Sequence, residues 1–293
     1  MSLTQVIRSS PTLRSVLAVP LAVRRQWIDH QDKPLRAFLD RFEATLVSEV
    51  RLRVDEFDGE FLLGPKSHLL RRVLAFGAYE PELAQLFVAH IDANRDVIDV
   101  GANVGFFTNL AARKLETGRV LAIEPTAAAY DRLTRNIAHN GITERAIAWR
   151  GVAAAEEGEL TLNVVEGREE YSSLGAIVHP SVEGEAVASE TVPARTIDAL
   201  VAEHDLKPAV IKIDVEGAEM DVLRGAQETL KTHRPVVISE VSAPLLRTAG
   251  TSTAAIVQLF DALDYDVRDP TNPLMDPTNI EFGDIVATPR PNH

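Results

Sequence analysis

One stretch of the sequence, Asp96–Leu115 (DVIDVGANVGFFTNLAARKL), limits the possible folds more than any other part of the chain. It begins as a short apolar run, breaks at Gly101 and Gly105, and continues with apolar residues at helical spacing. A buried strand that passes through a glycine turn directly into a helix is typical of open α/β sheets that bind a nucleotide-like ligand. The turn alone fits several ligands, so other residues must distinguish them.

Strand-like and helix-like segments alternate along the chain after this turn. Short apolar runs that we expect to form strands occupy residues 97–100, 119–123, 146–150, 210–213 and 236–239. The clearest helical patterns cover residues 104–115, 127–140 and 252–263. This alternation predicts an α/β fold with a doubly wound, mostly parallel sheet. The last two strand-like segments, 265–268 and 284–288, are joined only by a loop, which predicts an antiparallel hairpin at one edge.

The segments outside this alternation are less regular. Residues 1–49 have a mixed helical pattern with three proline breaks, and we expect an N-terminal helical extension there. Alternation around Asp58-Gly59 predicts a β-hairpin over residues 50–63. Residues 166–190 lack periodicity and predict a long loop. The expected organisation is therefore the extension followed by one domain over residues 50–290.

The composition limits the partners that the chain can bind. Its formal net charge is −13, from 43 acidic and 30 basic side chains, and such a surface repels phosphate backbones, so we expect no nucleic-acid partner. The absence of cysteine excludes thiolate nucleophiles and disulfides. The most apolar early stretch, Val16–Val23, is shorter than the ~20 residues of a membrane span and lacks the order of a signal peptide, so we expect a cytoplasmic protein. Packing of this segment against a second copy would be compatible with a homodimer.

The residues around the glycine turn indicate what it binds. Their spacing is G-x-x-x-G rather than the G-x-G-x-x-G of dinucleotide sites. Asp99 lies two residues before Gly101, where its carboxylate would repel a pyrophosphate. A carboxylate there suits a ligand with positive charge and amino donors, and S-adenosylmethionine has both a sulfonium and an α-ammonium group. A turn that serves only packing is the simpler alternative for this stretch alone.

Glu124 favours an adenosine-type ligand. It ends the next predicted strand, 19 residues after Gly105, where an acidic side chain can accept hydrogen bonds from both hydroxyls of a ribose. A solvated glutamate at a strand end is common, so Glu124 has weight only in combination with Asp99 and the glycine turn. Together these residues indicate S-adenosylmethionine.

A further group of acidic residues follows the later strands. Asp214 and Glu240 end two strands that we expect to be neighbours, and Glu216 and Glu219 are three residues apart in the predicted helix after Asp214. Clustered carboxylates can form a general base or bind a divalent cation such as magnesium. The sequence does not decide between these uses. For Glu219 the simpler interpretation is a solvated helix start.

Several motifs together resemble the FkbM-type methyltransferase family. The motifs are DVIDVGANVGFFT, the IEP at residues 123–125, ARTIDAL at 194–200 and IKIDVEGAEMDVLRGA at 211–226, of which the last is the most specific. The resemblance covers residues 50–288 and implies a class I methyltransferase fold, a Rossmann-like sheet of seven strands. It also implies S-adenosylmethionine as donor and O-methylation of a hydroxyl on a small molecule, a sugar or glycan, or a natural product.

The resemblance implies roles for individual residues. Those expected to contact the cofactor are Asp99, Gly101, Ala102, Asn103, Gly105, Thr108 and Glu124, with Asp214 near its methionine end. The candidate catalytic bases are Asp214, Glu216 and Glu240. The candidates for contact with a small-molecule or glycan acceptor are Glu80, Ser172 and Ser173.

Two other functions remain open at the level of the sequence. An NAD(P)-dependent oxidoreductase of the Rossmann type would share the glycine turn and Glu124, but it requires the missing G-x-G-x-x-G motif. A non-catalytic scaffold that binds S-adenosylmethionine would not need the clustered carboxylates. The sequence therefore favours an S-adenosylmethionine-dependent O-methyltransferase.

Overall fold

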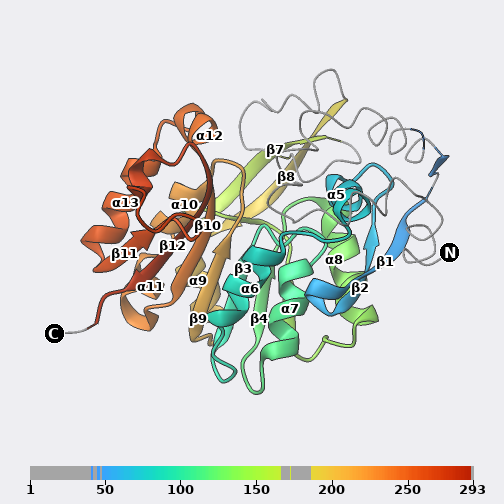
Figure 1. The fold of residues 1–293 in the computed structure, drawn as a ribbon, viewed down its shortest axis with the longest axis horizontal. Coiled ribbons are helices and arrows are strands. Elements are labelled where there is room, and N and C mark those ends of the chain that lie inside the picture. The colour runs from blue at the N-terminus through green and yellow to red at the C-terminus, as the bar shows by residue number, and fades with distance from the viewer. Residues whose placement is uncertain (1–40, 42–44, 47, 166–171, 173–185, 292–293) are drawn as a thin grey trace.

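The structure is a computed structural model that describes residues 41, 45–46, 48–165, 172 and 186–291. The predicted N-terminal extension lies almost entirely outside the described residues, so its boundary with the domain stays a prediction. The described residues form a central β-sheet with helices on both faces (Figure 1).

The central sheet has seven strands in the order β11-β12-β10-β9-β3-β4-β5. Their bounds are β3 (Asp96–Val100), β4 (Val120–Ile123), β5 (Ala146–Trp149), β9 (Pro208–Ile213), β10 (Val236–Ser242), β11 (Tyr265–Arg268) and β12 (Phe282–Pro289). The five strands from β10 to β5 run parallel, and β12 lies between β10 and β11 antiparallel to both. The predicted doubly wound sheet with an antiparallel hairpin at one edge is confirmed. Strand order reverses between β3 and β9, which is where such sheets bind ligands.

The helices form two layers, one on each face of this sheet. One layer contains α5 (His68–Phe76), α6 (Pro81–Ala89), α7 (Phe106–Lys114) and α8 (Ala127–His139). The other contains α9 (Ile197–Glu203), α10 (Glu219–Arg224), α11 (Gln227–His233), α12 (Ala243–Thr248) and α13 (Thr253–Ala262). Strand side chains alternate between the layers, so Val97 packs with the first and Ile98 with the second. None of the described helices combines the length and the apolar character needed to cross a bilayer.

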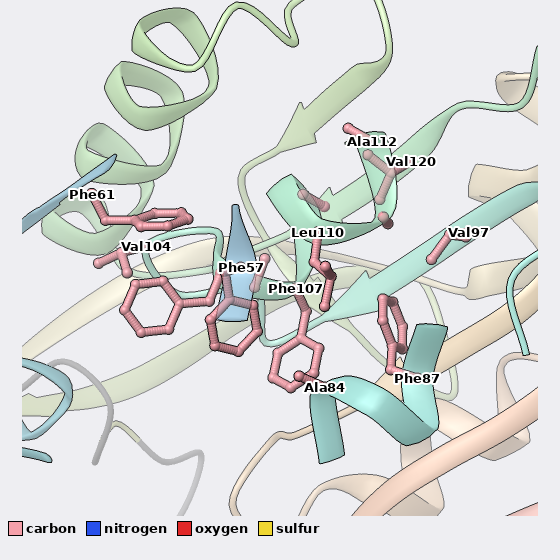
Figure 2. Packing of buried hydrophobic residues seen from close by; sticks show 14 of the residues in the cluster. Phe57, Phe61, Ala84, Phe87, Val97, Val104, Phe107, Leu110, Ala112 and Val120 are labelled. Atoms are coloured by element: carbon pink, nitrogen blue, oxygen red, sulfur yellow. The ribbon is translucent and has the colours of Figure 1, made fainter. Parts of the chain in front are cut away.

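An aromatic cluster joins the predicted hairpin to the helix that follows the glycine turn (Figure 2). The hairpin consists of β1 (Val50–Val54) and β2 (Gly59–Leu63), with Phe57 in the turn between them. The ring of Phe57 stacks on Phe106 with centroids 4.9 Å apart and meets Phe107 edge to face at 5.0 Å. Such pairs are worth about 0.5–1.5 kcal/mol each beyond the burial of their area. The hairpin therefore helps to fix the start of α7, which borders the candidate site.

A second, smaller sheet corrects one prediction. It has the order β6-β8-β7, with β6 (Val152–Ala153), β7 (Gly158–Val165) and β8 (Val187–Arg195). The prediction of a long loop over residues 166–190 was wrong at its end, because β8 begins at Val187 and its residues 187–194 pair with β7. Most side chains of β8 are polar or exposed, so the strand has no apolar run by which to recognise it.

Candidate functional site

The predicted acidic residues Asp99, Asp214 and Glu240 lie near the carboxyl ends of three parallel strands. Asp99 of β3 is opposite Lys212 of β9 in the register, and Glu240 of β10 is opposite Asp284 of β12. Because side chains alternate along a strand, Asp99, Lys212 and Glu240 face the same side of the sheet. Asp214 follows β9 at this edge, close enough for its charge to act on both Asp99 and Glu240. The structure thus brings together acidic residues that are far apart in the sequence.

The glycine turn passes very close to the end of β9. Gly101 has a φ of +79°, and a Cβ atom on it would lie 1.8 Å from the carbonyl oxygen of Asp214. The N–H groups of Gly101 and Ala102 both donate hydrogen bonds to the carbonyl of Ile123 at the end of β4. Two further residues of the turn, Asn103 and Gly105, also have positive φ. The turn is therefore fixed between β4 and β9, and only glycine fits at position 101.

Replacing Gly101 with alanine is expected to lower the free energy of unfolding by about 1–3 kcal/mol through strain alone, and by more where the backbone of Asp214 cannot move aside. Gly141→Ala is the matched control, because Gly141 has a similar φ of +67° but a Cβ there would meet nothing within 4 Å. Urea unfolding of both variants measures the difference. Equal losses would contradict the importance of the Gly101–Asp214 contact.

Asp99 is buried at the start of the turn with one oxygen unpaired. Its side chain is 1% exposed, and its Oδ2 accepts a hydrogen bond of 2.6 Å from the Thr108 hydroxyl. Within the part of the chain that the structure describes, Oδ1 has no hydrogen-bond partner. Burial raises the pKa of Asp99, and the positive charge of Lys212 opposes this shift. A buried acceptor without a partner costs free energy, so this oxygen is suited to a donor from a ligand.

Glu124 is buried beside the same turn and is held by several hydrogen bonds. Its Oε2 accepts from the backbone N–H of Asn103 at 2.9 Å. Its Oε1 accepts from both the backbone N–H and the hydroxyl of Thr126, at 2.9 and 2.7 Å. Glu124 thus joins the glycine turn to the start of α8 and supports the positive φ of Asn103. Its position at the end of β4 is the one that the sequence predicted.

Lys212 is the most important site residue that the sequence analysis missed. It is 4% exposed, and its ammonium lies 3.0 Å from Oδ2 of Asp214 and 4.5 Å from the ring centroid of Phe107. Burial alone would lower the pKa of Lys212, but the carboxylates of Asp214 and Asp99 raise it above its ordinary value. The signal was a lysine inside the apolar run of β9, because lysine is almost never fully buried without a partner.

The environment of Glu240 favours the protonated form of its carboxyl group. Burial raises the pKa of Glu240 well above its usual range, and the negative charges of Asp214 and Glu80 raise it further. Glu80 precedes α6 with a φ of +42° and accepts a hydrogen bond of 3.2 Å from Arg72. The structure therefore brings Glu80, predicted as an acceptor-site residue, into the same electrostatic environment as Asp214 and Glu240. Burial and the charge of Glu80 also raise the pKa of Tyr79.

The segment between β9 and α10 corrects two predictions. Glu216 does not share a helix face with Glu219, because Glu216 and Gly217 have φ values of +49° and +100° and α10 begins only at Glu219. Glu219 is not a solvated helix start, since it is buried and its Oε1 accepts the N–H of Gly217 at 2.9 Å. Burial raises the pKa of Glu219 to about 7. The hydrogen bond from Gly217 to the buried carboxyl group of Glu219 thus helps to fix the turn that carries Asp214 and Glu216.

The remaining predicted residues are less informative. The hydroxyl oxygen of Ser172 is shielded from solvent and has no hydrogen-bond partner among the described residues, while Ser173 lies outside them. Over the residues that the structure describes, no group of three or more histidine or acidic side chains has an arrangement that could hold a metal ion. The possible magnesium site therefore has no structural support.

Comparisons with known proteins agree on one family. The model of the methyltransferase FkbM domain matches residues 99–267, which is more than half of the chain. Methyltransferase sdnD of Sordaria araneosa is 28% identical over 165 residues, covering 48% of this chain and 64% of its own. Hexuronic acid methyltransferase AglP of Haloferax volcanii is 27% identical over 168 residues, covering 54% and 61%. The chain thus spans less than two thirds of the length of either relative.

Solved structures with related folds are more distant. The FkbM methyltransferase of Methylobacillus flagellatus has a TM-score of 0.43 at 16% identity, covering 87% of this chain and 58% of that one. An O-methyltransferase of Bacillus cereus in complex with S-adenosylhomocysteine also has a TM-score of 0.43, at 14% identity, covering 87% and 97%. At these values neither neighbour bears on the activity, and the fold class follows from the strand order and the family model.

Proposed function

The chain belongs to the methyltransferase FkbM domain family, and on this premise we propose that it is an S-adenosylmethionine-dependent O-methyltransferase. The proposed acceptor is a hydroxyl group of a small molecule, a sugar or glycan, or a natural product. The printed name of the Haloferax volcanii relative, a hexuronic acid methyltransferase, supports a sugar-like acceptor.

The observation that carries this proposal is the buried, unpaired Oδ1 of Asp99 beside the glycine turn. The ammonium group of S-adenosylmethionine is a donor that would satisfy this oxygen and complement its negative charge. A pyrophosphate would instead be repelled by the same carboxylate. The residues present therefore fit the methionine end of S-adenosylmethionine and do not fit a dinucleotide.

The adenosine end of the cofactor would lie against the glycine turn and the end of β4. Glu124 is held in place by Asn103 and Thr126, and we assign to it the ribose hydroxyls. Gly101 and Gly105 let the turn pass close to the end of β9 and to Leu133 of α8, which fixes its backbone where the cofactor would lie. Ala102, Asn103 and Thr108 complete this proposed donor site.

The acceptor side of the site would be formed by the clustered carboxyl groups. When bound, S-adenosylmethionine supplies an electrophilic methyl group on a sulfonium. Asp214 is paired with the ammonium of Lys212 and is the carboxylate that we propose to accept the proton of the acceptor hydroxyl. Glu240, held neutral by its environment, would donate a hydrogen bond to the acceptor. Glu216 and Glu80 lie around this pair and would contact the rest of the acceptor.

Calorimetric titration with S-adenosylmethionine, S-adenosylhomocysteine and NAD tests the proposed donor. Both adenosyl ligands are expected to bind, and NAD is expected not to bind. Glu124→Ala is expected to weaken the binding of both adenosyl ligands by ~1–3 kcal/mol, because their ribose hydroxyls lose an acceptor. Repeating the titration with magnesium tests the carboxyl groups as a metal site. Binding of NAD alone would reject the proposal, and unchanged affinity in the variant would remove Glu124 from the site.

A further inference from the structure

Two asparagine side chains of α8 close the outer edge of the hairpin strand β2, beside which α8 lies (Figure 1). Among the residues that the structure describes, β2 pairs with one strand only, β1. On its other edge, the amide of Asn136 accepts the N–H of Leu62 at 2.7 Å and donates to the carbonyl of Leu62 at 3.3 Å. The amide of Asn140 makes the same two bonds with Glu60, at 3.0 and 2.8 Å. Each side chain thus replaces the backbone of a neighbouring strand.

The spacing of the two asparagines on α8 matches the spacing of their partners on β2. Four residues rise about 6 Å along a helix, and two residues rise about 6.7 Å along a strand. Both side chains are buried, and the oxygen and nitrogen of each amide are hydrogen-bonded. A buried amide with its donors and acceptor all paired has one favourable orientation. The contact between α8 and the hairpin is therefore specific in its geometry.

Asn136 differs from Asn140 in the partner of its third hydrogen bond. Nδ2 of Asn136 donates to the carbonyl of Val104 at 2.9 Å, inside the glycine turn, whereas Nδ2 of Asn140 donates to the carbonyl of Asn136 within α8. The peptide group between Val104 and Gly105 is then bonded on both sides, since the N–H of Gly105 donates to the carbonyl of Ala102. Asn136 therefore joins the glycine turn directly to β2, and Asn140 does not.

Other residues of α8 also border the proposed cofactor site. Leu133 packs on the turn, because a Cβ atom on Gly105 would lie 2.7 Å from its Cδ1. At the start of the helix, Thr126 donates two hydrogen bonds to Glu124, the residue assigned to the ribose. The bond from Asn136 to Val104 thus adds a polar connection beside the apolar contact of Leu133. The shape of the turn depends on both contacts with α8.

We propose that Asn136 is a positioning residue of the cofactor site, which holds the carbonyl of Val104 so that the glycine turn keeps the shape that receives S-adenosylmethionine. This inference rests on the proposed function, because it takes the turn as the place of the cofactor. Asn136 acts through Val104, since its own amide is already fully bonded. Without this bond the peptide group before Gly105 is free to rotate, because glycine restricts the backbone least. The loss then falls on the affinity for the cofactor.

Asn136→Leu and Asn140→Leu form a matched pair for the test. Leucine is similar in size, and each substitution removes both bonds to β2 and the third bond of the amide. Both variants are therefore expected to lose thermal stability. Only Asn136→Leu is expected to bind S-adenosylhomocysteine more weakly, by about tenfold, the scale of one buried hydrogen bond. Calorimetric titration measures the affinity at a temperature at which circular dichroism finds both variants folded.

The outcomes separate this inference from the function on which it rests. If the wild type does not bind S-adenosylhomocysteine, the proposed function fails and the inference fails with it. If the wild type binds and the two variants have equal affinities, only the inference is overturned. Should Asn136→Leu not fold, amide exchange of the wild type decides. S-adenosylhomocysteine should then slow the exchange of the Leu62 amide, bonded to Asn136, more than that of the Glu60 amide, and equal effects would overturn the inference.

Discussion

Replacing Lys212 with methionine is expected to lower the free energy of unfolding by about 3–5 kcal/mol. Methionine has a similar length and keeps the apolar contact with Phe107, so the loss comes from the charge. Without the ammonium, Asp214 loses its partner at 3.0 Å and the buried carboxylate of Asp99 loses the positive charge that compensates its own. Breaking a buried pair on one side costs far more than removing a surface pair. Urea unfolding measures the effect.

The pH dependence of this loss identifies its cause. Burial already raises the pKa of Asp99 in the folded protein, and removing Lys212 should raise it further. A carboxyl group whose pKa is raised by folding favours the folded state at low pH, and this contribution is lost as pH rises through the folded pKa. The destabilisation should therefore be larger at pH 8 than at pH 5. A loss that is the same at both pH values would indicate a packing defect instead.

Lys231→Met is the matched control for this substitution. Lys231 forms an ion pair of 2.9 Å with Glu228 on the surface of α11, where both side chains are at least half exposed. Such pairs contribute about 0–1 kcal/mol, so the control should change the stability little. A comparable loss in both variants would mean that the buried position of Lys212 has no special importance.

The strands of the central sheet could be predicted from the sequence because they are buried on both faces. Strands such as β3 and β9 are buried at every position and are mostly apolar in sequence. The smaller sheet could not be predicted in the same way, since β8 exposes most of its side chains and has a proline near its end. Helix α5 was also missed, although Ser67 caps it by accepting the N–H of Leu69. A capping serine is too common in loops to define a short helix alone.

Site residues could be predicted where their role follows from their position at a strand end. They could not be predicted where their role depends on burial by other parts of the chain. Asp99 and Glu124 follow from their places at strand ends, and in the structure Asp99 precedes the glycine turn while Glu124 accepts a hydrogen bond from its Asn103. The burial of Glu219 depends on the left-handed conformation of Glu216 and Gly217. Because of it α10 begins only at Glu219, and the spacing of apolar residues does not predict this start. The ion pair of Lys212 with Asp214 depends on which side chains of neighbouring strands meet, and this requires the register.

Asp214→Asn is expected to reduce methyl transfer about 10²–10⁴-fold when the protein is saturated with S-adenosylmethionine. This is the usual range for removing a general base. Asparagine keeps the shape of the side chain and an oxygen that can accept from Lys212, but it cannot take a proton from an acceptor hydroxyl. The backbone N–H of Asp214 would still bond to Val100, so the fold should persist. The rate of S-adenosylhomocysteine formation with an acceptor that binds in titration measures the loss.

Glu240→Gln distinguishes the two roles that the clustered carboxyl groups could have. Because burial and the charges of Asp214 and Glu80 favour the protonated form of Glu240, an amide of the same size would replace one hydrogen-bond donor with another. The loss of turnover should then stay below about tenfold, the scale of one neutral hydrogen bond. The opposite result, with Glu240→Gln inactive and Asp214→Asn active, would make Glu240 the base, with Asp214 serving to hold Lys212. Similar large losses in both variants would mean that the two groups share the proton as a pair.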